Sequence, residues 1–214
     1  MFDTVVGKLL PTIVLFFSGL AFGQDDALLQ QVWDGIQAAQ KKYASTCGTL
    51  TETRTSALLA RPLVFHGKYC AAGMNRFSLE YTGRDPVRLR YNDGYLNVTT
   101  TRGGEKRTEV LEVGQQVRRT QAYFSRENSI QNLKRNFTIT LRENGQSYDM
   151  RLVPKSSRFA NRVNYVAVKL LKDSFLLSSL EVDGKNGVHS KYDIQVTDLN
   201  PKIDEEMFHV YKPK

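Results

Sequence analysis

Residues 165–197, YVAVKLLKDSFLLSSLEVDGKNGVHSKYDIQVT, decide the fold of this chain. They begin with two segments rich in Val, Leu, Tyr and Phe, 164–171 and 175–182, which we interpret as strands. The loop 183–187 follows, and its Asp-Gly and Asn-Gly steps supply the positive φ values that a hairpin turn requires. The spacing therefore predicts consecutive antiparallel strands.

A third strand follows this loop, because apolar residues alternate with polar ones, at Tyr192, Ile194 and Val196. A period of two is typical of a sheet with one face in water. An acidic loop then leads to a short fourth strand, which we expect at 207–211. The last third of the chain thus predicts part of a large antiparallel sheet.

The earlier chain adds strands to this sheet. Segments of strand composition separated by turn residues occur at 49–55, 63–70, 76–81, 87–91, 95–100, 137–141 and 148–153. Residues 110–117 fit a strand or a loop, and 122–133 show weak helical patterning. We expect one α+β domain, built on an incomplete antiparallel β-barrel of about eleven strands.

One amphipathic helix precedes the strands. It begins at Asp25 or Asp26, either of which can cap it, and it ends near residue 45. Its apolar stripe consists of Leu29, Val32, Trp33, Ile36, Ala39 and Tyr43. An apolar sheet face must be covered, so we expect this helix to lie over the sheet as a lid.

Residues 1–23 have the features of a signal peptide. Lys8 precedes the apolar run 9–20, and small residues stand at Ala21 and Gly23, the two positions that a signal peptidase reads. The alternative is an uncleaved anchor, but the run is short for a membrane span. We expect cleavage, export to the periplasm and a mature domain at 24–214.

The two cysteines, Cys47 and Cys70, flank a predicted hairpin at nearly equal distances from its turn. Opposed positions on antiparallel strands satisfy the Cα spacing of a disulfide, and an exported protein meets oxidising conditions. We expect a disulfide that stabilises the fold by about 3 kcal/mol. The alternative is a catalytic thiol, although no His lies close to either Cys in sequence.

The charge pattern limits the classes of molecule that this protein is expected to bind. The formal net charge is +8 in 214 residues, which suits anionic lipid or an acidic protein. Export, and the absence of basic runs interleaved with aromatics, argue against nucleic acid. The sequence holds no nucleophile elbow, no phosphate loop and no zinc-helix motif, so we expect no enzyme activity, no metal and no cofactor.

The apolar sheet face and the covering helix suit an exported protein that binds an acyl chain, since each buried methylene contributes about 0.8 kcal/mol. We expect the residues that line such a cavity to come from the helix and the central strands. They are Trp33, Ile36, Phe77, Leu79, Leu89, Tyr91, Leu96, Val98, Val166 and Val168. A closed core would show the same periodicity.

Several short motifs, in order, resemble the outer-membrane lipoprotein carrier family, LolA. They are Arg61-Pro62-Leu63, His66-Gly67-Lys68-Tyr69, Gly83-Arg84-Asp85-Pro86, Tyr91-Asn92-Asp93-Gly94-Tyr95-Leu96, Arg151-Leu152-Val153-Pro154-Lys155, Leu180-Glu181-Val182-Asp183 and Met207-Phe208-His209-Val210-Tyr211-Lys212-Pro213. The resemblance extends over nearly all of the mature length, and it rests on order and spacing together.

This resemblance implies a barrel wrapped over an apolar cavity, with a helical lid. It also implies a monomeric periplasmic carrier that receives acylated lipoproteins, or another lipid, from an inner-membrane release complex and delivers them to an outer-membrane acceptor. Members often carry an Arg-Pro pair whose Arg holds the lid closed. Here Arg76 is the nearby candidate for that lid contact, and Leu79 stands where a Trp is common, which indicates a divergent relative.

Two further functions compete with the carrier. LolA-like domains also occur in sensors of envelope stress that bind anti-sigma factors, although these normally carry a second domain. The same fold also hosts a small enzyme of the violacein pathway, so fold alone does not decide function. A polar pocket with a perturbed acid or base would favour the enzyme.

Overall fold

The computed structural model of the chain describes residues 26–73, 75–115 and 130–212. The signal peptide expected at 1–23 and most of the weakly helical segment 122–133 lie outside these residues. In the described part, no helix is both long enough and apolar enough to span a membrane.

Eleven antiparallel strands form one sheet, in the spatial order β6-β5-β4-β3-β2-β1-β11-β10-β9-β8-β7. The strands are β1 Ser45–Ser56, β2 Leu63–Ala72, β3 Arg76–Thr82, β4 Val87–Asn92, β5 Tyr95–Arg102, β6 Glu105–Glu112, β7 Phe137–Asn144, β8 Ser147–Pro154, β9 Val163–Leu171, β10 Leu177–Gly184 and β11 Val188–Leu199. Each strand pairs with its neighbour in sequence, and the pairing of β1 with β11 joins the two meanders. Within the described ranges the edge strands β6 and β7 do not pair with each other, so the barrel is open.

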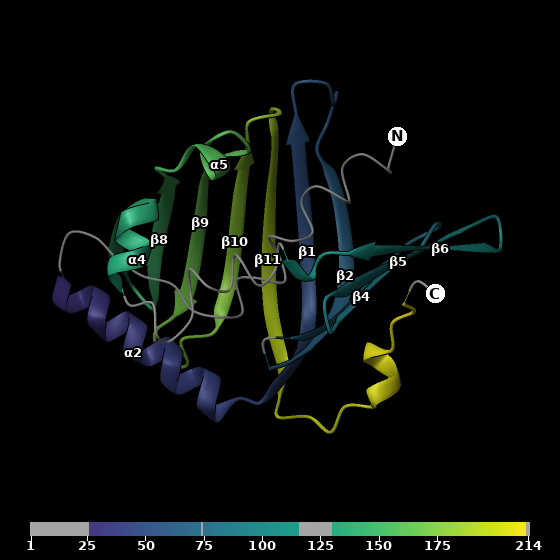
Figure 1. Cartoon of the computed structure of the whole chain (residues 1–214), viewed down its shortest axis with the longest axis horizontal. Coiled ribbons are helices and arrows are strands. Elements are labelled where there is room, and N and C mark those ends of the chain that lie inside the picture. Colours follow the sequence, from purple (N-terminus) through teal and green to yellow (C-terminus); the bar gives the residue numbers. More distant parts are fainter. Residues whose placement is uncertain (1–25, 74, 116–129, 213–214) are drawn as a thin grey trace.

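The sheet is strongly twisted, and helices lie beside both of its halves. Figure 1 shows steep strands from β8 to β11 and nearly level strands at β5 and β6. The helices are α2 Asp26–Lys42, α4 Ile130–Asn136, α5 Ser157–Ala160 and the 3₁₀ helix η2 Glu205–Phe208. Helix α2 crosses the half that holds β8, β9 and β10, and α4 and α5 lie beside the same half, whereas η2 lies beside the other (Figure 1). The expected open antiparallel barrel with a covering helix is therefore confirmed.

The sequence placed most elements correctly, but the end of the chain differs. The segment 207–211 is not a strand, because Asp204 caps η2 by accepting a hydrogen bond from the Glu206 backbone N–H at 3.0 Å. Strand β10 begins at Leu177 rather than at Phe175, since Phe175 has a φ of 55° and closes the turn after β9. The uncertain segment 110–117 contributes only its first residues to a strand, β6.

Candidate functional site

The inner face of the sheet, defined here as the face that packs against α2, is built from apolar rows that cross several strands. Tyr69, Leu79, Leu89 and Val98 face one another in register across β2 to β5. In the other half, the row runs through Met150, Val168, Leu180 and Tyr192 across β8 to β11. Strand alternation places every member of a row on the same face. The inner face is therefore continuous across both halves.

All ten residues predicted to line a cavity lie in one buried cluster on this inner face and on α2. They are Trp33, Ile36, Phe77, Leu79, Leu89, Tyr91, Leu96, Val98, Val166 and Val168, none of them more than 8% exposed. The sequence thus identified residues that share one buried cluster, and their role as the lining of a ligand cavity stays a prediction.

Helix α2 is held to the inner face mainly by apolar side chains. Its buried residues are Leu29, Val32, Trp33, Ile36 and Ala39. Polar links to the rest of the fold occur near its first turns, where Gln31 Nε2 donates to Tyr148 Oη at 3.1 Å and Lys134 pairs with Asp26. Gly35 lies directly against the ring of Phe175, where a Cβ atom would overlap that ring. The contact is close and largely non-directional.

The carboxyl end of α2 is fixed by Asn200. The Asn200 Oδ1 atom accepts from the Ala44 backbone N–H at 2.7 Å, and its Nδ2 atom donates to the Lys42 carbonyl at 3.0 Å. The Asn200 backbone N–H donates to the Ser45 carbonyl at 2.8 Å. Any motion of α2 away from the sheet would therefore pivot about this end.

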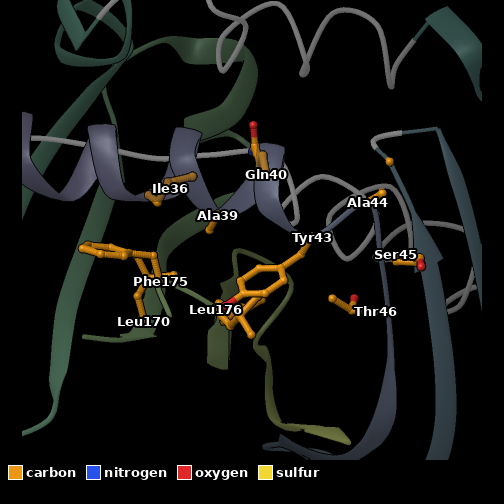
Figure 2. A pocket seen from close by; sticks show the side chains of 13 residues that line it. Ile36, Ala39, Gln40, Tyr43, Ala44, Ser45, Thr46, Leu170, Phe175 and Leu176 are labelled. Atoms are coloured by element: carbon orange, nitrogen blue, oxygen red, sulfur yellow. The ribbon is translucent and has the colours of Figure 1, made fainter. Parts of the chain in front are cut away.

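A small cavity opens beside this pivot, between α2 and the turn that joins β9 to β10. Its volume is ≈ 70 Å³. Figure 2 shows Tyr43 projecting from the end of α2 beside Leu176. Ile36 lies further along the helix, and Phe175, from the turn between β9 and β10, lies near that part of it. The start of β1 contributes Thr46 to its wall. We call this cavity the mouth.

A polar cluster lies in the middle of the apolar inner face, where β1 meets β2 and β11. Glu52 is 1% exposed and accepts from Tyr81 Oη at 2.5 Å and from Tyr192 Oη at 3.3 Å. Arg54 donates to the same carboxylate through Nε at 3.0 Å and Nη2 at 2.5 Å. A buried carboxylate is tolerated only when it is paired and hydrogen-bonded in this way.

Gly67 makes this cluster possible. Tyr81 stands on β3 and Glu52 on β1, so the phenol must pass over the intervening strand β2. The residue opposite Tyr81 on β2 is Gly67, and a Cβ atom there would lie 3.4 Å from Tyr81 Cδ1 and 3.0 Å from the Glu80 carbonyl oxygen. The missing side chain leaves the space over which Tyr81 reaches the carboxylate.

Burial shifts the titration of three inner-face phenols upward. Desolvation raises the pKa of Tyr69 to about 12, with a smaller opposing effect from Thr46. Desolvation, and then the charge of Glu52, also raise the pKa of Tyr81 and of Tyr192 well above the ordinary value. These phenols therefore stay protonated, and those of Tyr81 and Tyr192 act as donors toward Glu52.

The predicted lid contact, Arg76, binds a different partner. Its Nη1 atom donates to both carboxylate oxygens of Glu205, at 2.6 and 2.5 Å, and its guanidinium lies 5.4 Å from the centroid of the Phe208 ring. Both partners belong to η2, so the described contacts of Arg76 are with this 3₁₀ helix near the end of the chain and not with α2.

Cys47 and Cys70 stand opposite each other on β1 and β2 and are joined by a disulfide. They lie on the outer face of the sheet, since their neighbours Leu50 and Tyr69 have side chains on the inner face. The described part of the chain contains no free cysteine and no cluster of side chains suited to a metal ion.

Sequence reasoning missed the polar cluster, although the sequence carried a signal for it. In the predicted strand 49–55, Leu50, Glu52 and Arg54 occupy alternate positions and must share one face. An ion pair two residues apart on an apolar face is informative, because unpaired charge there would be costly. The partners Tyr81 and Tyr192 are distant in sequence and could not be assigned.

No protein-family model matches the sequence, and no curated protein matches it. Among solved structures the chain is similar to a LolA superfamily protein from Nitrosomonas europaea, with 8% identity, 85% of this chain and 97% of that chain covered, and a TM-score of 0.37. It is similar to the lipoprotein LppX from Mycobacterium tuberculosis, with 11% identity, 85% and 99% covered, and a TM-score of 0.48. It is also similar to a chain of the MucA/MucB complex from Pseudomonas aeruginosa, with 10% identity, 85% and 61% covered, and a TM-score of 0.48.

Proposed function

We propose that this protein binds acyl chains on the inner face of its sheet and carries them, as acylated lipoproteins or another lipid, between the inner and outer membranes. One observation carries the proposal: the apolar face crosses both halves of the open sheet, and α2 is held to the part that it covers mainly through apolar side chains. Such a cover can be exchanged for an acyl chain, because dispersion and the hydrophobic effect are not directional.

The exchange works by movement of α2 about its carboxyl end. Asn200 holds that end, and the mouth lies next to it. When the helix moves, Trp33 and Ile36 leave the inner face, and the acyl chain takes their place. The predicted residues of the sheet then form one wall of the cavity, and Trp33 and Ile36 on the displaced helix form the other.

The resemblance of the sequence motifs to the LolA family supplies the rest of the proposal. In this proposal the signal peptide is cleaved and the protein acts as a periplasmic monomer without cofactor or catalysis. It receives its client from an inner-membrane release complex and passes it to an outer-membrane acceptor.

The proposal is tested by locking the helix. The variant Gly35→Cys/Phe175→Cys places two thiols where α2 touches the β9–β10 turn. We expect the unmodified protein to take up a fluorescent fatty acyl probe, the oxidised variant to take up none, and the reduced variant to recover uptake.

The native chain serves as the matched control, because its two cysteines are already joined on the outer face. The same oxidation and reduction should leave its uptake unchanged. Equal uptake by the locked and unlocked variant would place the probe elsewhere on the surface. Absence of uptake by the native chain would mean that the inner face is a permanently closed core.

A further inference from the structure

The polar cluster of Glu52, Arg54, Tyr81 and Tyr192 has a position that a purely structural ion pair would not need. It interrupts two rows that are otherwise mainly apolar. Met150, Val168, Leu180 and Tyr192 lead in register to Glu52, with Phe65 beyond it on β2, and Leu152, Val166, Val182 and Ser190 lead to Arg54, with Leu63 beyond it. Replacing a buried ion pair by apolar residues is often neutral or stabilising. A sheet selected for stability alone would have continued both rows with apolar side chains.

The cluster is connected to the path proposed for the acyl chain. A second small cavity, of ≈ 10 Å³, lies against Tyr192 and shares Leu177 with the mouth. Thr46 lines the mouth, and Glu52 follows six residues later on β1, about 20 Å away at 3.4 Å per residue. A chain that lies along β1 and β10 between these points has its far end at the cluster.

Arg54 is the member of the cluster that has hydrogen-bond donors without an acceptor among the described residues. Its Nε and Nη2 atoms are bound to one oxygen of Glu52, whereas a guanidinium carries five N–H groups. Its plane lies over the ring of Phe65, at 5.3 Å from the centroid, and its side chain is 14% exposed.

The hydroxyl of Ser190 adds a further polar group beside Arg54. Ser190 stands opposite Arg54 across β1 and β11 and is fully buried. Its Oγ atom lies near the Tyr192 phenol but forms no well-aligned hydrogen bond with a described residue. Together, Arg54 and Ser190 offer donors for which the described residues supply no well-aligned acceptor.

The charge of the cluster selects the chemistry of the ligand. Glu52 and Arg54 form a neutral pair, and the three groups that bind Glu52 leave it as a satisfied acceptor. An anionic head group would add an uncompensated charge to an apolar face, which is costly. A neutral carbonyl oxygen can accept from Arg54 without that cost.

Resting on the function proposed above, we propose that Arg54, oriented by Glu52, Tyr81 and Tyr192, anchors the ester or amide carbonyl of the bound acyl group. The protein then takes esterified or amide-linked chains in preference to free fatty acids. Glu52 and the two phenols are positioning residues, since they hold Arg54 and do not touch the ligand.

The test compares two probes that carry the same fluorescent chain, one as a monoacylglycerol and one as the free fatty acid, at pH 7. A hydrogen bond from a charged donor corresponds to about tenfold or more in affinity, so we expect the native protein to bind the ester at least tenfold more tightly. The variant Glu52→Gln/Arg54→Gln removes both charges together and should bring the affinity ratio close to one.

The matched control is Glu80→Gln/Arg88→Gln, which removes a similar Arg–Glu pair from the outer face. It should keep the native ratio. A second inner-face variant, Arg54→Lys, preserves the cation beside Glu52 but loses the planar fork of donors, and it should lower the ratio even if the double variant folds poorly.

The outcomes separate the two proposals. Equal binding of both probes by the native protein, or a ratio that survives in Arg54→Lys and in the double variant, would overturn the anchor and leave the acyl-binding function standing. Failure of the native protein to bind either probe would overturn both.

Discussion

Two segments pack on opposite faces of the sheet, and they are held in different ways. Helix α2 covers the inner face through five buried apolar side chains and few polar links. The C-terminal segment, defined here as residues 204–212, lies on the outer face of β3 to β5 and buries only Phe208 and Val210. It is fixed by hydrogen bonds to its backbone.

The contacts of the C-terminal segment are directional. Asn97 binds both the backbone N–H and the carbonyl of Tyr211, at 2.5 and 3.0 Å. Asn92 donates to the Phe208 carbonyl at 3.2 Å, and Lys212 pairs with Asp93 at 2.7 Å. Breaking such a set leaves partly buried polar groups unpaired, whereas α2 can exchange one apolar contact for another. This difference is the reason why the proposed function assigns the movement to α2 and not to the C-terminal segment.

The largest expected effect comes from removing the anchor of the fixed segment. Phe208 is 1% exposed, and the change Phe208→Ala should lower the free energy of unfolding by about 3–5 kcal/mol through lost burial and a residual cavity. Urea denaturation measures this loss. At urea concentrations below its unfolding transition, the variant should take up an acyl probe as the native protein does.

Met207 provides the matched control, because it precedes Phe208 but is 37% exposed. The change Met207→Ala should alter the free energy of unfolding by no more than about 0.5 kcal/mol. If Phe208→Ala reduced acyl uptake while the protein stayed folded, the two segments would be coupled, and the distinction between them would be wrong.

This fixed segment also shows how far the sequence could be followed. Ten of the eleven strands were predictable because alternation and turn residues are local signals, and the inner-face residues followed from the same alternation. Strand β6 was not, since residues 110–117 fitted a strand or a loop and the strand begins earlier, at Glu105. The segment 207–211 has the composition of a strand, yet the backbone of Tyr211 bonds to the Asn97 side chain rather than to a neighbouring strand. Only the tertiary structure reveals that an amide side chain replaces a strand partner.

The partner of Arg76 was beyond the sequence for a similar reason. Glu205 lies 129 residues further along the chain, and nothing local connects the two. The resemblance to a carrier family suggested a contact with α2 instead, because family members use an Arg near this point. The position of Arg76 in the motif therefore did not reveal its partner, because its side chain points to the outer face, which η2 covers.

An intermediate effect is expected at alkaline pH, and it reports how well Tyr69 is shielded from water on the inner face. Tyr69 has a pKa of about 12 because it is buried, whereas an unfolded Tyr titrates near 10. Between these values the folded state holds the proton that the unfolded state has lost. The stabilising contribution of Tyr69 is therefore complete below pH 10 and is lost as pH rises through 12, at up to about 1.4 kcal/mol per pH unit.

Chemical denaturation at pH values between 9 and 12 measures that slope. In the variant Tyr69→Phe, the free energy of unfolding should fall less steeply with pH, by about this amount. Tyr95→Phe changes a phenol on the outer face and provides the control. If absorbance titration gave Tyr69 a pKa near 10, water would reach it freely, and this part of the inner face would be open in the resting protein.

The smallest effect concerns Arg76, which contacts the C-terminal segment although the family resemblance assigned it to α2. Its ion pair with Glu205 joins side chains that are 37% and 76% exposed, and exposed pairs of this kind contribute less than about 1 kcal/mol. A double-mutant cycle of Arg76→Gln and Glu205→Gln should therefore give a coupling free energy below that value. If Arg76 serves only the C-terminal segment, neither variant should change the rate of acyl uptake. Faster uptake in Arg76→Gln but not in Glu205→Gln would restore the lid role that the family resemblance implied, and it would mean that Arg76 changes partner when α2 moves.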